Sequence, residues 1–120
     1  MSLLSQTPAP VSAATLEEAR QLFVQTPAGD PRREAYLAQW REFSAREVGS
    51  ARNIFDARNA YFRAYGETPE KASALQKFLH LLEEDIIAAT TRGLLQFLAD
   101  FAPLLSEARS HALQKLSLTV

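Results

Sequence analysis

Several residue types and patterns are missing from this chain of 120 residues, and each absence removes a class of structure or function. There is no cysteine, so disulfides and zinc sites with thiolate ligands are excluded. The four glycines are scattered, so no glycine-rich phosphate-binding loop is present. No apolar run reaches the roughly 18 residues that a membrane-spanning helix needs. The net charge of −1 gives no overall field that would attract nucleic acid or an anionic membrane. These absences favour a cytoplasmic protein that binds neither.

Apolar residues at helical spacing dominate what is present, and strand-like alternation is missing. Residues 30–66 form one pattern, which begins at an Asp-Pro pair and ends at a glycine. Residues 68–101 form a second, which begins at a Thr-Pro pair. A helix of about 35 residues is roughly 50 Å long. We therefore predict an all-α helical bundle built on a long antiparallel helical hairpin, continuous through Gly49 and without an internal repeat.

The remaining segments are shorter. Residues 1–14 contain two prolines and no periodicity, and they predict a flexible N-terminal tail, followed by one helical domain over residues 15–120. Thr15 and Glu18 have the spacing of a capping box, which predicts a short first helix. Pro103 should end the second long helix, and Ser106 is positioned to begin the last one.

Residues 86–102 are apolar on nearly every side of the predicted helix. A helix of this kind is buried on more than one face. Because so few predicted helices are available to cover both faces, the pattern predicts a homodimer in which this segment forms the interface.

Residues that could carry chemistry are few. Di-iron bundles need Glu-x-x-His pairs, and the chain has none; His80 and Glu84 are the nearest approach. No Gly-x-Ser-x-Gly elbow accompanies the two histidines. We therefore expect no catalytic residue, no cofactor and no metal. Arg41, Arg52 and Arg63 form a row that could bind nucleic acid, but a solvated helix face is the simpler interpretation.

Two charged residues, Glu47 and Arg58, fall inside the apolar stripe of the first long helix. They are too far apart along the helix to pair with each other. We expect one of two arrangements, since an unpaired buried charge is costly. Either each side chain extends to solvent or finds a partner on a neighbouring helix, or the two residues pair reciprocally across a dimer axis.

The chain resembles the dimeric regulatory domain of RsbU-type stress-response serine phosphatases, which shares its fold with the C-terminal domain of the KaiA clock protein. The resemblance covers residues 31–116 and rests on Gly66, Thr68-Pro69, Ala72, Leu75, Leu79, the segment Leu94-Leu95-Gln-Phe97-Leu98-Ala-Asp-Phe101, Ala108, Leu113 and Leu116. It implies a homodimer that binds a regulatory protein, such as a kinase-like switch protein, in a groove beside the dimer interface. The groove and interface residues it suggests, together with the apolar segment, are Ile54, Leu94, Leu95, Leu98, Ala99 and Phe101.

From the sequence we thus expect a non-catalytic, dimeric interaction module with a regulatory role in signal transduction. Two alternatives remain: a helical bundle enzyme that binds a metal or ligand, and a helical protein that binds nucleic acid.

Overall fold

The computed structural model describes residues 9–120, and within them every regular element is a helix. This confirms the all-α class. The helices are α1 (Leu16–Gln25), α2 (Arg32–Ser50), α3 (Ile54–Arg63), α4 (Pro69–Ala88), α5 (Arg92–Phe101) and α6 (Glu107–Leu118).

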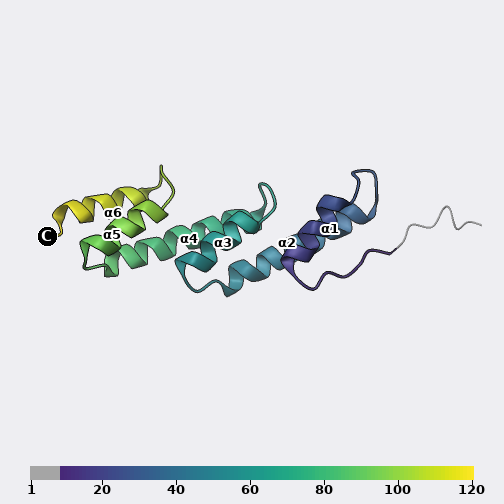
Figure 1. Ribbon diagram of the computed structural model, residues 1–120, viewed down its shortest axis with the longest axis horizontal. Helices are drawn as coiled ribbons and strands as arrows, with labels where there is room; N and C mark the ends of the chain where they lie inside the picture. Colours follow the sequence, from purple (N-terminus) through teal and green to yellow (C-terminus); the bar gives the residue numbers. More distant parts are fainter. Residues whose placement is uncertain (1–8) are drawn as a thin grey trace, which may run out of the picture.

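The helices pack as three consecutive pairs, α1 with α2, α3 with α4 and α5 with α6. The pairs follow one another along a single axis, so that α1 and α6 lie at opposite ends (Figure 1). The molecule measures 78 × 23 × 19 Å, far longer than it is wide. Helix α4 contacts both α2 and α6 and so connects the three pairs. The packing in pairs agrees with a bundle, but the pairs stack in a line instead of surrounding one centre.

The helix starts reveal a repeat that the sequence was not expected to contain. Thr15, Asn53 and Thr91 cap the short first helix of each pair by accepting a backbone N–H with the side chain. Their numbers differ by 38 in both steps (53 minus 15 and 91 minus 53). The same spacing separates Asp30, Thr68 and Ser106, whose side chains accept an N–H at the start of each second helix. The chain is therefore built from a 38-residue helix pair, an architecture in which each repeat contacts mainly its neighbours.

One contact between neighbouring pairs recurs in the same register. Lys77 Nζ donates to Val48 O at 2.7 Å, and Lys115 Nζ, 38 residues later, donates to Ile86 O at 2.8 Å. Both carbonyls belong to the last turn of the preceding long helix, where the one backbone donor is the weakly bonded N–H of the C-cap residue, Ala51 or Ala89. The lysine thus fixes the second helix of one pair to the C-terminal end of the second helix of the preceding pair.

The N-terminal segment takes the corresponding place on the first pair. Gln39 stands one repeat before Lys77, and its Nε2 donates to Val11 O at 2.9 Å. Ala13 N donates back to the Gln39 side chain at 2.7 Å. Part of the expected tail is therefore held against α2. The rest of that prediction, residues 1–8, lies outside the described residues.

The two long helices expected from the sequence are both broken, and that prediction was wrong. The first does continue through Gly49, but Ala51 is extended (φ −64°, ψ 129°) and Asn53 caps a new helix. The second breaks at Ala89 (φ −68°, ψ 132°), before Thr91. The apolar spacing of the sequence continues through both breaks, because Ala51 and Ala89 are buried at the corners between two helices. Spacing alone therefore does not reveal where the helices end.

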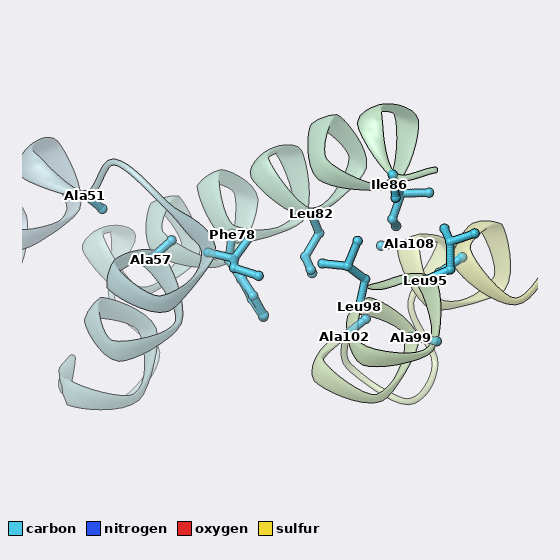
Figure 2. Packing of buried hydrophobic residues seen from close by; sticks show 13 residues of the cluster. Ala51, Ala57, Phe78, Leu82, Ile86, Leu95, Leu98, Ala99, Ala102 and Ala108 are labelled. Carbon is cyan, nitrogen blue, oxygen red and sulfur yellow. The ribbon is translucent and has the colours of Figure 1, made fainter. Parts of the chain in front are cut away.

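Buried side chains form two separate clusters. One belongs to the first pair and consists of Leu16, Ala19, Phe23, Tyr36 and Trp40. The other joins the second and third pairs, where Leu82 and Ile86 of α4 lie close to Leu98 and Leu95 of α5, and Phe78 lies between Ala57 and Leu82 (Figure 2). The second and third pairs therefore share one core.

Candidate interaction surface

Helix α3 is apolar on both of its faces. Ile54, Ala57 and Ala60 form the buried face, and the two small alanines let α3 lie close to α4. On the other side, the exposed fractions of Phe55 and Phe62 are 52% and 62%. Large aromatic rings on the solvent side of a capped helix contribute nothing to its core.

Helix α5 presents apolar residues on the same side of the molecule. Leu95 and Leu98 are buried, whereas Leu94 and Phe97 are 44% and 42% exposed. Phe101, one turn beyond Phe97, is half-buried.

The exposed rings of the two helices meet. The centroid of Phe55 lies 5.2 Å from that of Phe101 and 6.1 Å from that of Phe97. Phe101 in turn contacts the buried ring of Phe78 at 5.7 Å, which anchors the group to the shared core. We call this surface the aromatic patch; it consists of Phe55, Arg58, Phe62, Leu94, Phe97 and Phe101.

Arg58 is the charged member of the aromatic patch. Its guanidinium carbon lies 5.0 Å from the ring centroid of Phe62 and 4.8 Å from that of Phe101. Both distances fall within the range of cation–π contacts. The charge therefore lies among rings and links the outlying Phe62 to the rings at the centre.

The structure places the predicted interface residues in two groups. Leu95, Leu98, Ala99 and Ile54 are at most 3% exposed, because the helices of their own chain cover them. Helices of the same chain thus cover one apolar side of residues 86–102, whereas Ile87, Leu94 and Phe97 on the other side stay exposed. Leu94 and Phe101 do reach the surface, as members of the aromatic patch. Dimerisation itself stays a prediction.

The charges at positions 47 and 58 both contact neighbouring helices of their own chain. Glu47 Oε2 on α2 lies 3.5 Å from Arg63 Nη2 on α3, and Arg58 packs on rings of α3 and α5. This is the first of the two interpretations given above. Burial raises the pKa of the Glu47 carboxyl above its ordinary value, although the Arg63 charge opposes that shift.

A polar hollow of about 260 Å³ adjoins Glu47 and is lined also by Ser50, Asp56, Asn59 and Arg63. It lies where the first pair meets the second, since its lining comes from α2 and α3. The Glu47–Arg63 ion pair forms part of its wall. The Ser50 hydroxyl donates to Glu47 O, and the backbone N–H of Asp56 donates to Asn53 Oδ1.

Groups suited to metal binding do not gather in the described part of the chain, where no three His, Asp or Glu side chains come together. His80 pairs with Glu84 at 3.0 Å on the surface of α4. His111 of α6 contacts Glu83 at 2.6 Å and thereby joins the second and third pairs.

The sequence analysis missed the aromatic patch because Phe55 and Phe62 have the apolar spacing of the first long helix, and in an unbroken helix that spacing places both rings on the side that faces the core. The signal that would have found it is the cap at Asn53, followed three residues later by an acid. If the helix begins at Asn53, a different set of residues faces the core, and the rings of Phe55 and Phe62 lie on the solvent side.

No helix in residues 9–120 has the length and apolar character to cross a membrane. Comparison with protein-family models, with curated proteins and with solved structures gives no match. The resemblance to the regulatory domain of RsbU-type phosphatases therefore stays a prediction.

Proposed function

We propose that this protein is a non-catalytic interaction module that binds a regulatory partner protein through the aromatic patch. The observation that carries the proposal is the set of exposed rings, with Phe55 and Phe62 both more than half exposed. Single exposed apolar residues are common on soluble proteins, but contiguous exposed patches mark sites of interaction. Aromatic residues and arginine are also the residue types most enriched in such sites.

The architecture supports this proposal. Stacked helix pairs expose a large surface relative to their volume, and proteins of this kind commonly act by presenting such surfaces to partners. The aromatic patch extends over two successive repeats, so its shape depends on the ring contacts of Phe55 on α3 with Phe97 and Phe101 on α5. The buried ring of Phe78 on α4 contacts Phe101 and so supports this arrangement.

The two alternatives have weaker support. A metal-dependent enzyme would need a set of converging ligands, and the described residues contain no group of three. For nucleic acid, two of the three arginines in the predicted row are paired with acids, Arg41 with Glu70 and Arg63 with Glu47. Such pairing reduces the positive charge available to phosphates.

Site-specific photo-crosslinking in the producing cells tests the proposal. A benzoyl-phenylalanine at position 97 should give a discrete product heavier than the chain, and the additional change Phe55→Ser should abolish it. The same label at Gln76, which is exposed on α4 outside the aromatic patch, is the control. A product of twice the chain mass would indicate a homodimer. Absence of any product, or equal products from both positions, would contradict the proposal.

A further inference from the structure

Arg58 is a cation without an acid. Among residues 9–120, no carboxylate lies within ion-pair distance of its guanidinium, and the group makes no hydrogen bond. Its described neighbours are the rings of Phe62 and Phe101. Rings satisfy the face of a guanidinium but leave its N–H donors free.

In the other two repeats, the side chain at the position of Arg58 donates a hydrogen bond to an acid of its own helix. One repeat earlier, Arg20 donates from Nε to Glu17 Oε2 at 3.1 Å. One repeat later, Gln96 donates to Asp100 Oδ1 at 3.0 Å. In the second repeat, the residue that corresponds to Glu17 is Phe55 (17 plus 38 is 55). The residue that corresponds to Asp100 is Phe62 (100 minus 38 is 62), so rings of the aromatic patch stand at both positions where the other repeats have an acid.

A carboxylate from outside would complete this arrangement. Arginine binds a carboxylate through two parallel N–H···O bonds, which are short and strong because both groups are charged. The surrounding rings keep water away from the pair, so the attraction is stronger than between charges in water. Apolar side chains placed on either side of the acid would cover Phe62 on one flank and Phe55 with Phe97 on the other.

From this complementarity we infer that the occupant of the aromatic patch is an amphipathic segment of another protein, in which a single Asp or Glu stands between apolar residues and pairs with Arg58. The inference rests on the proposed function and adds the chemistry of the partner. A run of acids would not serve, because only one cation lies among the rings.

A displayed library of random 16-residue peptides tests this inference. The library is selected on immobilised full-length protein, in parallel on the wild type, on Arg58→Glu and on the double variant Phe55→Ser with Phe97→Ser. We expect the wild type to enrich peptides with one acid flanked by apolar residues, and Arg58→Glu to enrich peptides with Lys or Arg at that place. Synthetic peptides should lose at least tenfold in affinity when the acid becomes Gln or when Arg58 becomes Gln.

Arg20→Gln is the matched control, because it removes the corresponding arginine one repeat earlier and should leave peptide affinity unchanged. If the wild type enriches apolar peptides without a bias for acids, the inference fails while the proposed function stands. If the double variant enriches the same peptides as the wild type, the aromatic patch is not the binding surface and the proposed function fails as well. Self-association that Phe55→Ser abolishes would make a second copy the occupant and would overturn the inference.

Discussion

Ser44 offers a sharp test of the repeat register. It lies on α2 with only 1% of its surface exposed, and its hydroxyl has no hydrogen-bond partner. The residue one repeat later is Leu82, which is fully buried in the shared core. The register therefore assigns Ser44 to an apolar position, where the hydroxyl loses its hydration and gains no bond in return.

Removing that hydroxyl should stabilise the protein. A buried polar group without a partner costs about 1–3 kcal/mol, and alanine is better than serine in a helix by about 0.5 kcal/mol. After allowance for the small void that is left, we expect Ser44→Ala to raise the free energy of unfolding by about 1–2 kcal/mol. For a chain of this size, that corresponds to a rise in Tm of about 5–10 °C.

Thermal and urea unfolding, followed by circular dichroism at 222 nm, measure the change. Ser73→Ala is the matched control, because Ser73 is exposed on α4 and its replacement should give only the propensity gain of about 0.5 kcal/mol. Equal effects of the two substitutions, or a loss of stability in Ser44→Ala, would refute the assignment of this serine to a buried apolar position.

Three other changes test separate parts of the structure. Lys115→Met should cost about 1–2 kcal/mol in urea unfolding, because the last carbonyls of α4 lose a charged donor. Leu98→Ala should cost about 2–5 kcal/mol, whereas Leu94→Ala, which removes an exposed side chain, should cost less than about 1 kcal/mol; similar losses would mean that Leu98 is not interior. Because burial raises the pKa of Glu47, the folded state binds its proton more tightly than the unfolded state, so this group lowers stability as pH rises above about 4.5. Glu47→Gln should therefore be more stable than the wild type at pH 7, with the difference vanishing below pH 4; a variant that is less stable at pH 7 would show that the Arg63 charge dominates.

Much of the fold could be predicted from local signals. Thr15, Thr68 and Ser106 were identified as helix starts from their spacing to the next acid or proline, and each accepts an N–H in the structure. The glycine expected to end the first helical pattern, Gly66, follows α3 and has the left-handed φ of 46° that is common where helices end. Such signals are reliable because they depend on residues within one turn of each other.

The two helix breaks could not be found by apolar spacing. Ala51 and Ala89 are buried at the corners, so the stripe passes through them without interruption. The N-cap residues Asn53 and Thr91 mark where the new helices begin, but a single Asn or Thr also occurs inside helices and does not identify a break by itself. Only the 38-residue spacing shared with Thr15 distinguishes these caps, and a search for repeats would have found it.

The aromatic patch depends on contacts between repeats. Phe55 and Phe97 are 42 positions apart, and their meeting follows from how α5 stacks beside α3. Periodicity within one helix shows which residues share a face, but not whether that face is covered. Leu95 and Ala99 were predicted to lie at an interface because periodicity did not show that α4 and α6 of the same chain cover that face.

Small-angle X-ray scattering is the most direct test, because the whole account depends on helix pairs that stack in a line and thereby place α3 beside α5. The measurement should be made on fractions whose mass, from in-line light scattering, is the 13.3 kDa of one chain. For residues 9–120 the structure gives a radius of gyration of 19.7 Å and a longest extent of 78 Å, so the full chain should give values at or above these. A compact domain of this length would give about 14 Å instead, and that value would contradict the stacked repeats and, with them, the aromatic patch.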